Sequence, residues 1–282
     1  MMNSIEISGL VKNYPGFTLG PLNLQVPQGS IVGFVGENGA GKSTTLRLIL
    51  GLARPDAGTI RLLDQPAGPG HPEARERVGV VFDDISLPAN FTVKNACEFG
   101  KRLYKNWDSQ VFASYRQRFQ LASDKRVDQL SRGMRMKLGL AMALSHAADL
   151  LIFDEATSGL DPVIRDEVLD IMLEFIEDPS HSILFSSHIV SDIEKAADYI
   201  AFIHNGKLKL MEQKDELLEA WRIVALTNEQ ANQLDSTQVL GRRRHDFGQE
   251  VIVRTGAVPT GVQAGRPTIE DIMVYAIKGE DQ

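Results

Sequence analysis

The spacing of apolar residues predicts two kinds of β-strand along most of the chain. Residues 4 to about 30 alternate apolar and polar positions in short runs such as Ile5-Glu6-Ile7 and Leu22-Asn23-Leu24-Gln25-Val26, which is typical of an antiparallel sheet. The runs at 31–35, 150–153 and 183–187 do not alternate, and 150–153 has the pattern of a central strand buried on both faces of a parallel sheet. These patterns predict an α/β protein with a mostly parallel core sheet and an antiparallel β subdomain.

Between about 85 and 147 the apolar residues recur at three- and four-residue spacing, which predicts a helical insert between strands of the core sheet. Further helices are expected after core strands, and Pro162 favours the start of one of them. The helices are predicted at 93–104, 111–121, 134–147, 163–178 and 189–197.

The pattern changes beyond Leu218, so we predict two domains, 1–218 and 219–282. In the second, short β-rich runs at 221–226 and 251–255 flank a polar stretch that is rich in Gln and Asn. The run Thr268-Ile269-Glu270-Asp271 fits a capping box that opens a final helix to about Ile277. These features predict a small α/β appendage, which regulates the first domain, forms a dimer or covers a sheet edge.

A glycine-rich loop at residues 36–43 carries the most specific chemistry. It reads Gly-Glu-Asn-Gly-Ala-Gly-Lys-Ser, between the apolar strand 31–35 and a helical run from Thr45. Glycines let backbone N–H groups curl around a β-phosphate, and the positive end of the following helix dipole faces the same anion. Lys42 adds a full charge over the β- and γ-phosphates, and the Ser43 hydroxyl is a ligand for Mg²⁺.

Further polar segments lie at the ends of predicted core strands or close to them. Asp154 and Glu155 directly follow the run at 150–153, where they serve as an Mg²⁺ ligand and as the group that orients the attacking water, or merely as a helix cap. His188 ends the strand at 183–187. Two loop segments flank these acids in the sequence: Leu130-Ser131-Arg132-Gly133-Met134 upstream and Ser158-Gly159-Leu160-Asp161 downstream.

In their order and spacing these segments resemble the nucleotide-binding subunit of an ATP-binding cassette (ABC) transporter, from about residue 4 to residue 215. The resemblance implies a P-loop NTPase core, a substrate of ATP with Mg²⁺, and a site that is complete only in a head-to-tail homodimer or heterodimer. It implies that Asp154 holds the metal, that Glu155 is the general base, and that His188 contacts the γ-phosphate. The nucleotide contacts implied are Tyr14 on adenine, Gly36, Glu37, Asn38, Gly39, Ala40, Gly41, Lys42, Ser43 and Thr44 on the phosphates, and Ser131, Gly133 and Asp161 across the dimer.

Several of these residues have simpler explanations. Tyr14 is also consistent with an aromatic at a strand edge, with the nearby Phe17 stacking on adenine instead. His188 is also consistent with a hydrogen-bonded polar residue at a strand end. Ser131 is a good N-cap for the helix from Met134, a role compatible with an anion at the amino end of that helix.

The chain departs from the family pattern at two places. The signature, usually Leu-Ser-Gly-Gly-Gln, reads Leu-Ser-Arg-Gly-Met here, with Arg132 and Met134 as the changes. Asp83, after the strand at 78–82, stands where the family has a glutamine that touches the metal and faces the membrane partner. Asp83 is therefore either a metal ligand or part of a solvated turn.

The composition of the chain limits the kinds of molecule that it is suited to bind. The net charge of -7 makes nucleic acid an unsuitable main partner, and we interpret Arg242-Arg243-Arg244 as a solvated surface turn. The only cysteine, Cys97, forms no internal disulfide and suits a reducing cytosol. The sequence lacks an apolar run of about twenty residues and a signal-like N-terminus, so any link to a membrane is expected through a separate polypeptide.

The sequence thus predicts an ATPase subunit in the cytoplasm, on the inner face of the membrane, that drives a separately encoded permease of the exporter type. The alternative is a soluble ABC-type regulator that acts on a nucleoprotein partner. Tandem cassettes, a long coiled coil or a strongly basic face are typical of that alternative, and none is evident in the sequence. A nucleotide-binding protein without turnover is a further alternative, which Glu155 and His188 disfavour.

Overall fold

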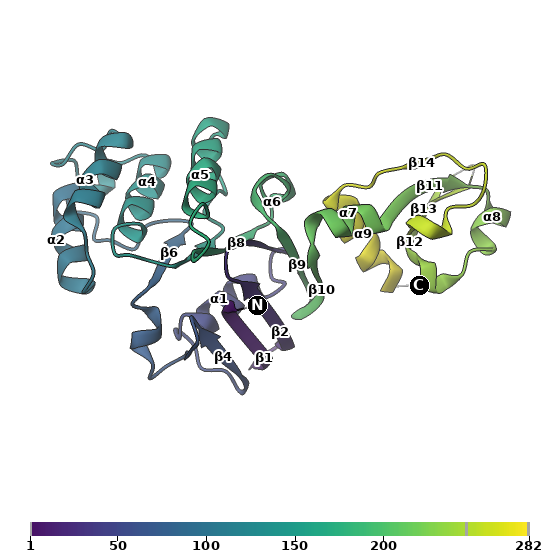
Figure 1. Cartoon of the computed structure of the whole chain (residues 1–282), viewed down its shortest axis with the longest axis horizontal. Coiled ribbons are helices and arrows are strands. Elements are labelled where there is room, and N and C mark those ends of the chain that lie inside the picture. The colour runs from purple at the N-terminus through teal and green to yellow at the C-terminus, as the bar shows by residue number, and fades with distance from the viewer. Residues whose placement is uncertain (1, 246–247, 281–282) are drawn as a thin grey trace. The chain divides into compact units, whose positions relative to one another are not determined.

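The structure is a computed structural model that describes residues 2–245 and 248–280 (Figure 1). The chain divides into two compact units, Met1–Met211 and Glu212–Gln282. The division falls earlier than the boundary predicted after Leu218, which lies inside helix α7 (Lys214–Ala220) of the second unit.

The first unit is built on a six-stranded sheet in the order β10-β9-β3-β8-β7-β6. Neighbouring strands from β9 to β6 run parallel, which confirms the predicted core sheet. Strands β3, β8 and most of β7 are buried along their length, as their apolar runs predict. The strands are β3 (Ile31–Val35), β6 (Val78–Phe82), β7 (Leu150–Asp154), β8 (Ser182–Ser187), β9 (Tyr199–His204) and β10 (Lys207–Gln213).

The predicted antiparallel subdomain is a four-stranded sheet in the order β2-β1-β4-β5. Its strands are β1 (Asn3–Tyr14), β2 (Phe17–Pro27), β4 (Ala57–Leu62) and β5 (Gln65–Pro66). One cluster of buried apolar side chains joins this sheet to helix α1 (Lys42–Ile49) and to the core sheet, and it contains Ile5, Leu24, Phe34, Leu46 and Ile152. The phosphate loop therefore sits between two sheets that share a core.

The helical insert lies between β6 and β7 in the chain, and Figure 1 shows its three helices side by side. Each begins at a polar cap: Thr92, Asp108 and Ser131 accept hydrogen bonds from backbone N–H groups of the first turn. The helices are α2 (Val93–Leu103), α3 (Ser109–Arg118) and α4 (Arg132–Ala143), with a short 3₁₀ turn at η2 (Val127–Gln129). Another 3₁₀ turn, η1 (Pro72–Arg75), precedes β6.

Two further helices cover the core sheet after β7 and β8. Helix α5 (Pro162–Phe175) begins at Asp161, with proline in its first turn as predicted. Helix α6 (Val190–Ala196) packs so closely on β3 that a Cβ added at Gly33 would lie 2.5 Å from Ile193. Among the described residues, no helix combines the length and the apolar character needed to cross a bilayer.

The second unit is an antiparallel sheet in the order β12-β13-β11-β14, and it has its own apolar core around Val224, Val251 and Val253. The capping box predicted at Thr268 is confirmed, since Thr268 and Asp271 exchange backbone-to-side-chain hydrogen bonds. The elements are β11 (Trp221–Leu226), α8 (Asn228–Asn232), η3 (Ser236–Gln238), β12 (Val239–His245), β13 (Gly248–Arg254), η4 (Thr255–Ala257), β14 (Ala264–Gly265) and α9 (Ile269–Glu280).

The prediction of a surface turn at Arg242-Arg243-Arg244 is wrong. These residues belong to β12 and pair with Val251, Glu250 and Gln249 of β13. Because β12 is an edge strand, long charged side chains are tolerated there, and they hinder pairing with another chain.

Candidate functional site

The phosphate loop joins β3 to α1, and an added Cβ would meet close neighbours at two of its glycines, Gly36 and Gly41. A Cβ at Gly36 would lie 2.4 Å from the Ile203 carbonyl oxygen, and one at Gly41 would lie 2.8 Å from Leu19. Gly41 also has a φ of +114°, in the region that favours glycine. The loop borders a cavity of about 220 Å³, lined by Phe17, Glu37, Asn38, Gly39, Gly41, Lys42, Ser43, Thr44 and Glu155.

Lys42 is buried, and protein oxygens surround its charge. Its Nζ donates to the Gly36 carbonyl at 2.6 Å and to the Glu37 carbonyl at 3.2 Å. It also forms an ion pair of 3.1 Å with Glu155 Oε1, and 5% of its side chain is exposed. In this arrangement the lysine and the acid expected to activate water neutralise each other.

Asp154 lies at the end of β7, where two hydroxyls converge on it. Ser43 Oγ donates to Asp154 Oδ1 at 3.1 Å, and Ser186 Oγ donates to the same oxygen at 3.0 Å. Burial raises the pKa of the Asp154 carboxyl, and the charges of Glu155 and Asp83 add to this effect against the two hydroxyl donors. A cation at this position would relieve the cost of that buried charge.

Glu155 follows Asp154 and is held in an uncommon backbone conformation, with a φ of +53°. Its Oε2 lies 2.5 Å from His188 Nδ1, and the His188 N–H donates to the same oxygen at 3.4 Å. Burial acts to raise the pKa of the Glu155 carboxyl, but hydrogen bonds from His188 and Lys42 outweigh it and lower the pKa. Glu155 is therefore ionised at neutral pH and linked to both the Lys42 ammonium and the His188 imidazole.

Ser131, Gly133 and Asp161 do not line this cavity in the part of the chain that the structure describes. Ser131 caps α4 by accepting from the Met134 N–H at 3.3 Å, and Asp161 caps α5 through the N–H groups of Val163 and Ile164. A Cβ at Gly133 would lie 2.2 Å from the tip of the Ile164 side chain, so α4 and α5 pack closely at this position. The guanidinium of Arg132 packs beside Gly159, where an added Cβ would lie 2.6 Å from it.

The two aromatic candidates differ in position, although they face each other across the β1–β2 hairpin. Tyr14 is 42% exposed, and the Lys12 ammonium lies 5.6 Å from the centre of its ring. Phe17 lines the cavity and lies against Gly41. The structure thus brings Phe17, and not Tyr14, to the phosphate loop.

The two acids after β6 have different surroundings. Asp83 lies close enough to Asp154 for its charge to raise the pKa of that carboxyl. Asp84 instead forms a bidentate ion pair with Arg135 of α4, at 2.7 and 3.2 Å, which lowers the pKa of Asp84. Arg135 also donates to the Leu130 carbonyl at 2.9 Å, so this pair connects the loop after β6 to the segment that carries Ser131.

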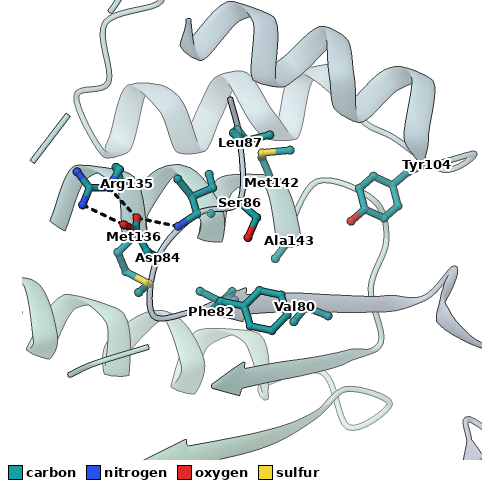
Figure 2. Close-up of a pocket in the computed structure, with 13 residues that line it drawn as sticks. Val80, Phe82, Asp84, Ser86, Leu87, Tyr104, Arg135, Met136, Met142 and Ala143 are labelled. Carbon is teal, nitrogen blue, oxygen red and sulfur yellow. Dashed lines mark hydrogen bonds and ion pairs between the residues drawn. The ribbon is translucent and has the colours of Figure 1, made fainter. Parts of the chain in front are cut away.

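A pocket of about 120 Å³ lies beside this ion pair, and Figure 2 shows Arg135 reaching Asp84 at its edge. Its walls come from β6, the loop after it and α4, with Val80, Phe82, Met136 and Met142 among them (Figure 2). A larger groove of about 560 Å³ shares Val80, Phe82, Ser86 and Tyr104 with it. Leu52 and Leu103 line that groove and are 67% and 54% exposed.

Sequence reasoning missed the roles of Ser186 and of the Asp84–Arg135 pair. Both depend on neighbours that are distant in the sequence: Ser186 pairs with Asp154 across two strands, and Asp84 meets a helix fifty-one positions away. A polar residue near the end of a buried strand was a visible signal for Ser186.

The fold and the loop define a P-loop nucleotide-binding protein, in which acids from the carboxyl edge of a parallel sheet meet a phosphate loop at a helix start. A family model described as "ABC transporter" matches residues 19–158. The bacitracin transport ATP-binding protein BcrA of Bacillus licheniformis is 35% identical over 213 residues, which cover 74% of this chain and 69% of the relative. The Nod factor export ATP-binding protein I of Paraburkholderia xenovorans (strain LB400) is 35% identical over 257 residues, or 84% of each chain.

A solved structure of the ATP-binding subunit of an ABC transporter superposes with a TM-score of 0.69 at 26% identity, covering 76% of this chain and 91% of the other. The chain belongs to the ATP-binding subunits of ABC transporters. The family, the fold class and the ATPase function predicted from the sequence are thereby confirmed, in preference to a regulator of a nucleoprotein.

Proposed function

We propose that the chain hydrolyses Mg·ATP as one half of a dimer and thereby drives export through a separately encoded membrane permease. The observation that carries the catalytic part is the convergence of Lys42, Glu155 and His188 beside the Ser43–Asp154 pair. A role in transport is supported by the name of the bacitracin relative, and the direction of export by the name of the Nod factor relative.

ATP fits the cavity because the loop from Gly36 to Thr44 offers backbone N–H groups and one lysine to its phosphates. An entering phosphate and the Glu155 carboxylate are both anions, so they compete for the Lys42 ammonium. In this structure that ammonium pairs with Glu155 and donates to the Gly36 carbonyl of the loop. Release from Lys42 frees Glu155 Oε1 to accept a hydrogen bond from the attacking water, while His188 still contacts Oε2. His188 keeps the carboxylate oriented and contacts the γ-phosphate in turn.

Mg²⁺ fits the donor set, because hydroxyl and carboxylate oxygens are hard ligands and the Asp154 charge is buried. Ser43 and Asp154 would hold the ion, and Asp83 is a further candidate because its charge acts on the Asp154 carboxyl. When bound, Mg²⁺ neutralises charge on the β- and γ-phosphate oxygens. Among the described residues no three His, Cys, Asp or Glu side chains form a metal cluster, so phosphate and water complete the shell.

The dimer is supported by the position of the signature residues. Ser131, Gly133 and Asp161 sit at the amino ends of α4 and α5 and do not line the cavity of their own subunit, in the ranges that the structure describes. Helix amino ends favour anions, so we assign these residues to the γ-phosphate held by a second subunit, either identical or related.

We assign the groove lined by Leu52 and Leu103 to the permease. It exposes large apolar side chains beside the loop after β6, and that loop is connected to α4 by the Asp84–Arg135 pair. A permease held there would sense movement of α4 through that loop. The chain would then lie in the cytoplasm on the inner face of the membrane, with a protein and not a nucleic acid as its main partner.

The test combines nucleotide binding with turnover. Lys42→Ala should remove most ATP affinity and all measurable hydrolysis, whereas Glu155→Gln should bind Mg·ATP, lose turnover and accumulate as a closed dimer. Calorimetry, phosphate release and size-exclusion chromatography measure these results, with the exposed Lys101→Ala as the control. Unchanged Mg·ATP affinity in a folded Lys42→Ala chain, or a Glu155→Gln rate within about twofold of the parent, would contradict the assignment.

The permease is tested by co-purification from detergent-solubilised membranes. A multi-spanning membrane protein retained by the parent chain and lost in Leu52→Asp with Leu103→Asp supports the groove as its docking site. Retention of that protein by the double variant would assign docking to another surface.

A further inference from the structure

Ser186 is a fully buried residue near the end of β8, directly beside the two acids of β7. The strand register pairs it with Asp154. Its hydroxyl donates to Asp154 Oδ1 at 3.0 Å and accepts from the Glu155 N–H at 3.1 Å. The Ser186 hydroxyl therefore donates a hydrogen bond to Asp154 and accepts one from the backbone of Glu155.

The hydrogen bond from the Glu155 N–H to the Ser186 hydroxyl supports a strained turn. Glu155 has a φ of +53°, which residues with a Cβ adopt only where their surroundings impose it. Its N–H is shared between the hydroxyl and the carbonyl oxygen of Ser186, the latter at 3.2 Å. The turn brings the Glu155 carboxylate to Lys42 and His188, so the geometry of the proposed base depends on this contact.

The hydrogen bond from Ser186 to Asp154 orients the carboxylate that is proposed to hold the metal. Ser43 also donates to Asp154 Oδ1, but its hydroxyl is itself assigned to Mg²⁺ and would leave that hydrogen bond when the ion binds. Ser186 is fully buried in β8 and is not among the described residues that line the phosphate cavity, so it has no such competing role. It is then the remaining donor that holds Asp154 in place.

We propose that Ser186 is a positioning residue for ATP hydrolysis, which through one hydroxyl aligns both the Asp154 carboxylate and the Glu155 backbone. Its hydroxyl is buried and contacts the two acids, through which it acts. The proposal rests on the roles assigned above to Asp154 and Glu155.

Ser182 offers a matched control on the same strand. It is also fully buried, and its hydroxyl lies 2.6 Å from the Ser4 hydroxyl. It pairs with Leu150 at the other end of β7, away from the acids. Removing either hydroxyl takes a hydrogen bond away from a buried polar partner, so both alanine variants are expected to lose some stability. Only the change at Ser186 should affect the chemistry.

The experiment uses the full chain with Ser186→Ala, Ser186→Cys, Ser186→Thr and Ser182→Ala. We expect Ser186→Ala and Ser186→Cys to lower kcat about tenfold with KM for ATP within about twofold, since the lost alignment acts mainly in the transition state. Cysteine fills nearly the same space but is a weak donor, so it separates hydrogen bonding from packing. Ser186→Thr keeps the hydroxyl and should recover most of kcat, while Ser182→Ala should match the parent.

A binding measurement adds a readout that is independent of turnover. Calorimetry of ATP with Mg²⁺ and with EDTA gives the factor by which Mg²⁺ strengthens binding. That factor should fall about threefold or more in Ser186→Ala, because Asp154 is less well oriented, and should stay unchanged in Ser182→Ala. Thermal unfolding of all variants checks that their folds are comparable.

Equal kcat in Ser186→Ala and the parent, or an equal loss in Ser182→Ala, would overturn the proposal. If Ser186→Thr does not fold, the comparison of Ser186→Ala and Ser186→Cys with Ser182→Ala still decides it. The turnover of Glu155→Gln is measured alongside. If Glu155→Gln retains turnover, the proposed function fails. If Glu155→Gln loses turnover but Ser186→Ala keeps the kcat of the parent, only the inference about Ser186 is rejected.

Discussion

Phe17 and Tyr14 are the two candidates for stacking on adenine, and they lie differently with respect to the phosphate cavity. Phe17 lines the cavity against Gly41, whereas Tyr14 lies on the exposed side of the hairpin under Lys12. A stacked base contributes about 1–3 kcal/mol, so we expect Phe17→Ala to weaken ATP binding about tenfold and Tyr14→Ala to weaken it less than about threefold. Titration of a fluorescent ATP analogue measures both. If Tyr14→Ala weakened ATP binding more than Phe17→Ala, stacking would be assigned to Tyr14, and the hairpin would have to rearrange on binding.

Asp83 and Asp84 are neighbours with separable roles. Asp83 adds to the negative charge around Asp154, and Asp84 pairs with Arg135. If Asp83 contributes to holding the cation, Asp83→Asn should raise the Mg²⁺ concentration for half-maximal ATPase about threefold or more, with Asp83→Gln similar. Asp84→Asn is the control and should leave that concentration unchanged. Identical Mg²⁺ titrations for the parent and both Asp83 variants would remove Asp83 from the metal site.

At the scale of elements, α6 carries a buried acid against α5. Asp192 has 5% of its side chain exposed, and its Oδ2 lies 3.9 Å from Arg165 Nε. Burial raises the pKa of Asp192 despite the Thr157 hydroxyl and the Arg165 charge. A raised carboxyl pKa means that the ionised form costs stability above that pKa, and that this cost disappears below the unfolded value of 3.8.

Asp192→Asn should therefore raise the melting temperature of the first unit at pH 7.5 by about 2–4 °C, the shift for about 1 kcal/mol in a domain of this size. The gain should shrink as the pH falls through the raised pKa towards 3.8. Asp166→Asn, at an exposed partner of Lys195, is the control and should change little. A variant less stable than the parent at pH 7.5 would show that Asp192 and Arg165 form a net favourable pair.

Elements with a clear period or cap were predictable from the sequence, and those defined by neighbours were not. The continuous run at 150–153 and the Thr268 capping box correspond to β7 and to the start of α9. Strand β12 was missed because its arginines resemble a solvated run, and only pairing with β13 makes it a strand. In the site, the loop 36–43 was visible as a contiguous motif. Phe17 was named only as the alternative to Tyr14, and Ser186 was not assigned, because their roles depend on side-chain direction and on strand register.

At the scale of the whole chain, the residues of the nucleotide site lie in one unit. Every residue that lines the phosphate cavity, together with Asp154 and His188, belongs to Met1–Met211. The second unit has its own sheet and its own apolar core, formed in part by Val224 and Val251. A chain ending at Gln213, the last residue of β10, should therefore keep its ATP affinity within about threefold of the parent.

Calorimetric unfolding of the full chain tests the same division directly. Two separate cores predict two transitions, and a ligand that binds only the native first unit stabilises that unit alone. In a Glu155→Gln chain, which does not consume ATP, Mg·ATP at about one hundred times Kd should add about 2.7 kcal/mol to the first unit. The melting temperature of the first unit should rise by about 5–10 °C, while that of the second unit should stay the same. Adding Lys42→Ala should abolish the shift, and a single transition that moves as a whole with ATP would show that the units unfold together.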